Sequence, residues 1–99
     1  MPAYVIAEVE TTQPDLVAEY RDLARAAIAE FGGRYVVRNE LPEGLEGEWP
    51  PGRRLVVLEF DSTERAREWY HSPSYAKALE ISRKAMVRRV AILQGHDPH

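Results

Sequence analysis

The sequence predicts an α+β fold in which a four-stranded antiparallel sheet carries two helices on one face. Four short runs are rich in β-branched and aromatic residues, as strands are. Two longer runs repeat apolar residues every three or four positions, as helices do. The runs follow the order strand, helix, strand, strand, helix, strand, and residues typical of turns and helix starts separate them.

The first half of the chain supplies a strand, a helix and a second strand. Residues 4–10, YVIAEVE, form the first strand. A helix is predicted from about 14 to 31, with Thr12 capping its start. The glycine pair at 32–33 ends this helix, because glycine adopts the left-handed conformation beyond a helix terminus without strain. Residues 34–38, RYVVR, form the second strand.

The second half begins with a long connection over residues 39–52, which holds four acidic residues, three prolines and three glycines. Residues 54–60, RLVVLEF, form a third strand that is apolar almost throughout. A second helix starts at Asp61. It is interrupted at 72–73, where serine and proline provide a new N-cap and first helical residue. Residues 90–93, VAIL, are the last strand.

This order of elements is that of the ferredoxin-like βαββαβ plan. Right-handed crossovers place the first and third strands in the centre of the sheet and the second and fourth at its edges. The chain of 99 residues fits one domain, which we expect over residues 1–95. Residues 96–99 are expected to be a flexible C-terminal tail.

Composition argues against several classes of function. The net charge of −3 argues against nucleic-acid binding, which needs a basic surface. There is no cysteine, which excludes disulfides and cysteine-ligated metal and fits a cytoplasmic protein. No apolar run is long enough to span a membrane, and no signal peptide is recognisable. Phosphate-loop, nucleophile-elbow and zinc-ligand motifs are also missing, so we expect no cofactor and no metal.

A homodimer is expected because both faces of the central strands are apolar. In the third strand Val56, Leu58 and Phe60 point one way, and Leu55 and Val57 point the other. One set meets the helices, and the other would expose an apolar patch of a few hundred Å². At about 25 cal/mol per Å², covering that patch with a second copy would stabilise the assembly by several kcal/mol. Two sheets laid face to face would also enclose a chamber.

The sequence resembles the domain of unknown function (DUF) 1330 family, which belongs to the dimeric α+β barrel superfamily. The matching segments are PAYVIA at 2–7, GGRYVVR at 32–38, LEGEW at 45–49, RLVVLEF at 54–60 and WYHSPSY at 69–75. The resemblance implies a homodimer of ferredoxin-like subunits and no established reaction. Relatives in the wider superfamily include cofactor-free monooxygenases, haem-degrading enzymes, isomerases and ligand binders, so the fold selects none of these activities.

Polar residues predicted on the sheet face opposite the helices form the candidate pocket. These residues are Tyr4, Glu8, Arg34, Arg38 and Glu59. Glu59 is expected beside Tyr4 and Arg34, and Glu8 within reach of Arg38, because buried carboxylates need partners. Such a cavity would bind a small organic acid. The alternative is that these are structural ion pairs sealing the dimer.

Other candidate residues have a structural alternative beside the functional one. Trp69 and Arg83 complete the candidate pocket, with a core anchor and a solvent-exposed cation as their alternatives. His71 is either a general base or haem ligand, or a histidine that favourably ends a helix. Glu46 and Trp49 are expected to contact the second subunit. The remaining expected dimer contacts are Ile6, Leu55 and Val57.

The function predicted from these features is a small-molecule binding or cofactor-free enzymatic pocket between sheet and helices at the dimer barrel. The first alternative is a non-catalytic dimeric structural or regulatory module. The second is a monooxygenase-like or haem-degrading enzyme of the same fold. No catalytic residue is assigned. The expected partners are a second copy of the chain and a small organic acid, with no nucleic acid and no membrane.

Overall fold

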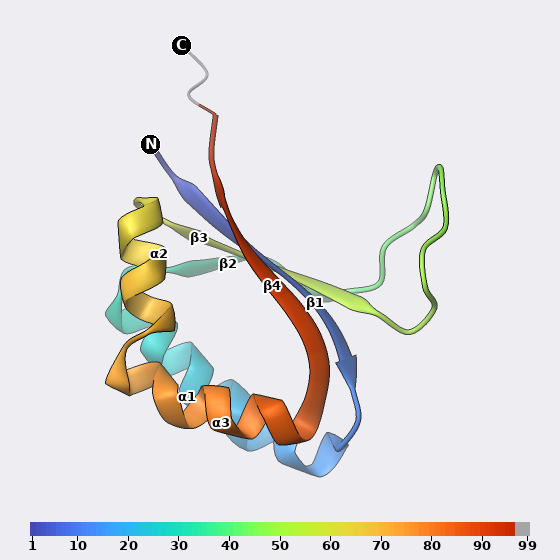
Figure 1. The fold of residues 1–99 in the computed structure, drawn as a ribbon, viewed down its shortest axis with the longest axis horizontal. Helices are drawn as coiled ribbons and strands as arrows, with labels where there is room; N and C mark the ends of the chain where they lie inside the picture. The colour runs from blue at the N-terminus through green and yellow to red at the C-terminus, as the bar shows by residue number, and fades with distance from the viewer. Residues whose placement is uncertain (97–99) are drawn as a thin grey trace.

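The computed structural model describes residues 1–96, so most of the tail expected at 96–99 lies outside the described residues. The elements in chain order are β1 (Ala3–Thr11), a 3₁₀ turn η1 (Pro14–Leu16), α1 (Val17–Glu30), β2 (Arg34–Glu40), β3 (Arg54–Phe60), α2 (Thr63–Tyr70), α3 (Pro73–Ala85) and β4 (Met86–Gln94) (Figure 1). The predicted order of strands and helices is confirmed. β4 is longer than predicted, because its pairing with β1 extends from Gln94 back to Met86.

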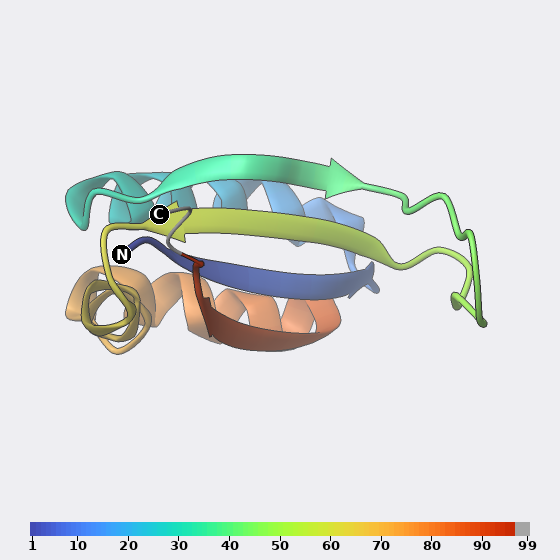
Figure 2. The same cartoon turned by 90° about the horizontal axis from the view of Figure 1, so that it is seen from above.

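The sheet has the predicted strand order, β2-β3-β1-β4, with antiparallel pairing throughout. The three α-helices lie on one side of it (Figures 1 and 2). Side chains on β1 alternate in burial, with those of Ala3, Val5, Ala7 and Val9 buried. This alternation is expected for a sheet that is covered by helices on one face only.

The helix starts follow local hydrogen bonding, and two predicted caps are wrong. Thr12 does not cap the first helix, because its backbone amide is bound to the carbonyl of Ala85 and the turn begins after Gln13 without a side-chain cap. α2 is capped by Ser62 rather than by Asp61, since the Ser62 hydroxyl accepts from the Arg65 amide. The predicted cap at Ser72 is confirmed, because its hydroxyl accepts from the Tyr75 amide.

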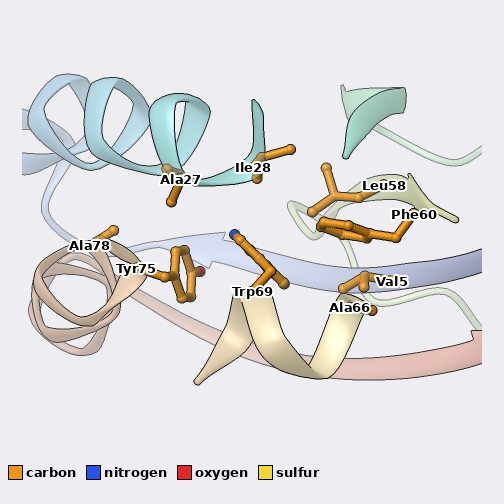
Figure 3. Packing of buried hydrophobic residues seen from close by; sticks show 10 residues of the cluster. Val5, Ala27, Ile28, Leu58, Phe60, Ala66, Trp69, Tyr75 and Ala78 are labelled. Atoms are coloured by element: carbon orange, nitrogen blue, oxygen red, sulfur yellow. The ribbon is translucent and has the colours of Figure 1, made fainter. Parts of the chain in front are cut away.

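The core lies between the helices and the inner face of the sheet, and aromatic rings from α2, α3 and β3 dominate it (Figure 3). The ring of Trp69 is 3% exposed. Its centroid lies 4.4 Å from that of Tyr75 and 5.3 Å from that of Phe60. The segment where α2 ends and α3 begins is therefore packed with aromatic side chains, and Trp69 is the core anchor that the sequence offered as an alternative to a pocket residue.

An irregularity in β2 changes which side chains share a face. Tyr35 pairs with Leu58, but Val37 pairs with Val57, so two steps along β2 match one step along β3. This pattern is a β-bulge at Val36, and the extra residue reverses the side to which the next residues point, up to a second register shift between Val37 and Glu40. As a result Arg38 is on the helix side of the sheet instead of the side where Arg34 lies.

The connection between β2 and β3 projects beyond the end of the sheet (Figures 1 and 2). Its apolar side chains are open to solvent, and that of Leu45 is 89% exposed. The indole nitrogen of Trp49 donates to the carbonyl of Glu46 at 3.0 Å, which closes a small turn at the tip. The segment therefore has local structure of its own but leaves apolar surface uncovered.

Candidate functional site: an arginine-lined cavity between the sheet and the helices

A cavity of about 90 Å³ lies between the helix-facing side of the sheet and helix α1, with Trp69 of α2 in its wall. All four strands contribute to the wall, and most of the side chains that line it are apolar, such as Val5 and Leu58. A water molecule needs about 10–15 Å³ of such volume, so the cavity has room for several waters or a small organic molecule.

Arg88 of β4 is a polar group in the cavity wall that three hydrogen bonds hold in place. Its Nη1 donates to the hydroxyl of Tyr20 at 2.8 Å, and its Nη2 donates to the hydroxyl of Tyr75 at 2.8 Å and to Oγ of Ser82 at 3.1 Å. The guanidinium carbon also lies 5.4 Å from the centre of the Tyr20 ring. Three neutral hydroxyls from α1 and α3 thus hold the cation in a fixed position.

The cavity wall is positively charged. Arg21 and Arg38 line it together with Arg88, and the described lining contains no carboxylate. Arg38 stacks on Tyr35, with its guanidinium carbon 4.8 Å from the ring centre. Among residues 1–96, the ion pairs are made by other arginines. The three cations of the wall therefore have no anionic partner within the described chain.

Two of the phenols at or next to the cavity, Tyr35 and Tyr75, have a raised pKa. Burial raises the pKa of Tyr75, and the neighbouring Tyr20 raises it further. Burial likewise raises the pKa of Tyr35. A phenol with a raised pKa keeps its proton, so these groups serve as hydrogen-bonding partners rather than as bases.

Trp69 presents an unpaired donor. Its Nε1 is the one buried side-chain nitrogen or oxygen within residues 1–96 that has no hydrogen-bond partner. In Figure 3 the indole nitrogen lies at the end of the ring nearest Tyr75, on the side of the tyrosine hydroxyl. A buried N–H that lacks an acceptor costs about 1–3 kcal/mol relative to a bonded one. Such a group in a cavity wall is a natural contact for a ligand.

The two glutamates predicted for the pocket lie on the opposite face of the sheet. Arg34 pairs with Glu59 as expected, through Nε at 2.7 Å. Glu8 does not meet Arg38, because the bulge turns Arg38 to the helix side. Glu8 instead accepts from Arg89 and Arg53, at 3.1 and 2.9 Å, and these two bonds lower the pKa of its carboxyl group. These charges therefore form structural pairs on the outer face.

The remaining candidate residues lie on the outer face of the sheet, in the cavity wall or at the protein surface. Tyr4 lies on the outer face opposite Glu59, as predicted from the strand register. Trp69 and Arg38 line the cavity, whereas Arg83 is exposed on α3. His71 lies in a separate groove between α2 and β4, outside the arginine-lined cavity.

Sequence analysis missed Arg88 and the tyrosine pair that holds it. The signal was alternation, because Arg88 is two and four residues before Val90 and Ile92, which pack against the core. A strand extended back by two residues would have placed Arg88 on the helix-facing side.

Two further findings limit the kinds of site. No group of three histidine or acidic side chains within residues 1–96 is placed to hold a metal ion. None of the helices in the same part of the chain has the length and apolar character to cross a membrane.

A family model described as "Domain of unknown function (DUF1330)" matches residues 2–96. The chain belongs to the DUF1330 family. The match covers every strand and helix described above, so the cavity lies inside the family's domain. Comparison with curated proteins finds no match for this DUF1330 chain.

Solved structures similar to this DUF1330 chain share its fold at low sequence identity. A protein of unknown function from Rhodopseudomonas palustris is 19% identical, with a TM-score of 0.77 over 98% of this chain and 84% of the other. SnoaB, a cofactor-independent oxygenase from Streptomyces nogalater, is 11% identical, with a TM-score of 0.61 over 99% and 98% of the two chains. A dimeric protein of unknown function with a ferredoxin-like fold from Bacteroides fragilis is 12% identical, with a TM-score of 0.62 over 95% and 96%.

Proposed function

We propose that this protein is a homodimer in which each subunit binds a small organic acid in the cavity between sheet and helices. The observation that carries the proposal is the composition of the wall, which combines apolar side chains with three arginines and no carboxylate among the described lining residues. Ligand sites of this kind bury an apolar body and fix its orientation through a few polar groups.

The net charge of the wall favours an acid over a neutral compound. Arg88 is half-buried, and within residues 1–96 it donates hydrogen bonds only to hydroxyl groups. A cation withdrawn from water without an anion is destabilising, and an anionic ligand would compensate it. Arg38 and Arg21 add positive charge to the same wall.

Binding is favoured over acid–base catalysis by the groups in the wall. The described lining contains no histidine, aspartate or glutamate. Burial raises the pKa of Tyr35. Histidine, aspartate and glutamate are the side chains that most often act as general bases. SnoaB is a cofactor-independent oxygenase of the same fold, and at 11% identity its activity is not transferred to this chain.

The open face of the sheet supports the homodimer. Ile6, Leu55 and Val57 are only half-buried there, and Val87 and Leu93 on β4 are 57% and 49% exposed. Monomers rarely leave many large apolar side chains together on one open face of a sheet. A second copy packed face to face is the occupant we propose, as in the dimeric barrels that the family resembles. One structural neighbour is described as dimeric.

The projecting connection is the second contact that we propose for the dimer. Trp49 is 51% exposed and Leu45 is 89% exposed. Both belong to the connection between β2 and β3, which projects beyond the end of the sheet (Figure 2). Together with Glu46, which holds the Trp49 indole, they would reach the partner subunit. Exposed aromatic residues of this kind are frequent anchors of interfaces.

A thermal-shift panel of small aromatic and aliphatic carboxylates tests the binding proposal. A ligand at ten times its Kd stabilises the folded state by about 1.4 kcal/mol. In a domain of this size each kcal/mol raises Tm by roughly 4–8 °C. We expect at least one carboxylate to raise the Tm of the parent protein. The same carboxylate should raise the Tm of the control variant Arg83→Gln, because the Arg83 side chain is exposed. Arg88→Gln should abolish the rise.

The same panel can contradict the proposal. If no carboxylate raises Tm of the parent protein, the cavity is not a site for organic acids. If Arg88→Gln and Arg83→Gln respond like the parent, the acids bind elsewhere on the molecule.

A further inference from the structure

We infer that Trp69, Tyr20 and Arg88 form one receptor for an ionised oxygen atom, so that the cavity binds the ionised form of its ligand and lowers the ligand's pKa. This inference rests on the proposed function and goes further, because it names the donors and the protonation state. The three residues come from α2, α1 and β4, and all three line the cavity.

The first donor is the indole N–H of Trp69. It is buried and has no acceptor within residues 1–96. Trp69 is 3% exposed, so solvent has little access to the group. An indole N–H can only donate, and therefore the group that completes it must carry an acceptor such as an oxygen atom.

The second donor follows from counting protons between Tyr20 and Tyr75. Both hydroxyl oxygens accept a hydrogen bond from Arg88, and the two oxygens are 2.8 Å apart. One hydroxyl therefore donates to the other, and one proton is left over. Tyr75 is fully buried and does not line the cavity, whereas Tyr20 does.

In this geometry the hydroxyl proton that is not shared between the two tyrosines is that of Tyr20. If Tyr20 donated to Tyr75, the proton of Tyr75 would have no acceptor in a fully buried position, which is destabilising. Within residues 1–96 no hydrogen bond joins Tyr75 to the Ser82 hydroxyl, which donates to the carbonyl of Leu79 and accepts from Arg88. Tyr75 therefore donates to Tyr20, and the Tyr20 O–H is free to donate into the cavity.

The charge of Arg88 completes the receptor. Two neutral donors would suit any carbonyl or hydroxyl oxygen, but a fixed cation next to them favours an oxygen with a full negative charge. Nη1 of Arg88 has donated one of its two protons, to Tyr20, and its other proton has no acceptor among residues 1–96. The ligand class is therefore a carboxylate, enolate or phenolate on a small apolar body.

The described wall also lacks a group that could take up the ligand's proton. It contains no carboxylate or histidine. A ligand that is still protonated in solution therefore releases its proton to solvent when it binds, and the negative charge stays on the oxygen next to Arg88. Preferential binding of the ionised form must lower the pKa of the bound ligand, by one unit for each tenfold preference.

Two probes that differ by one methyl group test this inference. The first is 4-nitrophenol, whose ionisation is followed by its absorbance, and the second is 4-nitroanisole, which cannot ionise. Both are titrated against the parent protein by equilibrium dialysis. The pKa of bound 4-nitrophenol is then measured by a pH titration of its absorbance under saturating protein. We expect tenfold tighter binding of the phenolate than of nitroanisole, and a bound pKa at least one unit below that of the free probe.

Variants assign the preference to the proposed donors. Trp69→Phe and Tyr20→Phe keep an aromatic ring and remove one donor each, and each is expected to reduce the phenolate preference severalfold while nitroanisole binding is unchanged. Arg83→Gln should leave both affinities as in the parent. Thermal unfolding checks that each variant is folded.

The outcomes separate the inference from the proposed function. If both probes bind equally and the bound pKa is not lowered, the cavity is a binding site but the oxyanion receptor is wrong. If the preference persists in both phenylalanine variants, other groups select the charge and the inference is again wrong. If neither probe binds, the proposed function fails and the inference fails with it.

Discussion

Replacing Val57 with glutamate is expected to convert the proposed homodimer to a monomer. Val57 is in the middle of the outer face, paired with Ile6 on one side and with Val37 on the other. A sheet-to-sheet interface would bury the new carboxylate among apolar side chains without a partner. That burial costs several kcal/mol, and a symmetric dimer contains the change twice.

Multi-angle light scattering of the purified variant at micromolar concentration measures the effect. The matched control is Ala26→Glu, which adds the same charge at an exposed position of α1. We expect the control to have twice the chain mass and Val57→Glu to have the mass of one chain. A Val57→Glu protein that stays dimeric would show that the outer face is not the interface.

Replacing Trp69 with alanine is expected to remove most of the protein's stability. The ring packs between Phe60 and Tyr75, with centroids 5.3 and 4.4 Å away. Truncation of a buried aromatic residue to alanine costs about 3–5 kcal/mol, and a small domain has roughly 5–15 kcal/mol in total. Urea unfolding followed by far-UV circular dichroism should therefore show a large fall in the transition midpoint.

Trp69→Phe separates packing from ligand binding at the same position. The indole N–H has no partner in the protein, so its removal forfeits no hydrogen bond within residues 1–96. The smaller ring leaves some unfilled volume in the core. The expected loss of stability on unfolding is therefore well below that of the alanine variant. If Trp69→Phe were as unstable as Trp69→Ala, the indole nitrogen would have a structural role that the geometry does not account for.

The fold was predictable because its determinants are local or periodic. The alternation in β1 and β3, the glycine pair after α1 and the serine–proline start of α3 each indicate their element directly. The two wrong caps show the limit of this reasoning. Thr12 and Asp61 have suitable side chains, but the chain path gives the first helix no side-chain cap and gives Ser62 the second.

The candidate site was harder to predict because an inserted residue in β2 changes the side of the sheet to which Arg38 points. Strict alternation along β2 places Arg34 and Arg38 together, and nothing in the run RYVVR marks a bulge at Val36. The bulge separates the two arginines, so one pairs with Glu59 on the outer face and the other lines the cavity. A bulge depends on pairing with a neighbouring strand, which the sequence of one strand does not specify.

The position of Arg88 on the helix-facing side could not be predicted for a different reason. Arg88 and Arg89 are adjacent in the sequence and look like a surface pair, but neighbours in a strand point to opposite faces. Arg89 pairs with Glu8 on the outer face, and Arg88 bonds to Tyr20 and Tyr75 on the inner one. Only the pairing of β4 with β1 as far as Met86 reveals which arginine faces the helices.

The measurement that tests the central claim most directly is a titration with benzoate followed by the ¹H–¹⁵N signals of the indole groups. The chain has two tryptophans, and the second, Trp49, provides an internal control because its N–H is already bonded to Glu46 on the projecting connection. A Trp49→Phe variant assigns the two signals. A ligand oxygen bound next to Arg88 and Trp69 would move the Trp69 signal downfield and leave the Trp49 signal in place. A Trp69 signal that stays fixed at saturating benzoate would contradict the account.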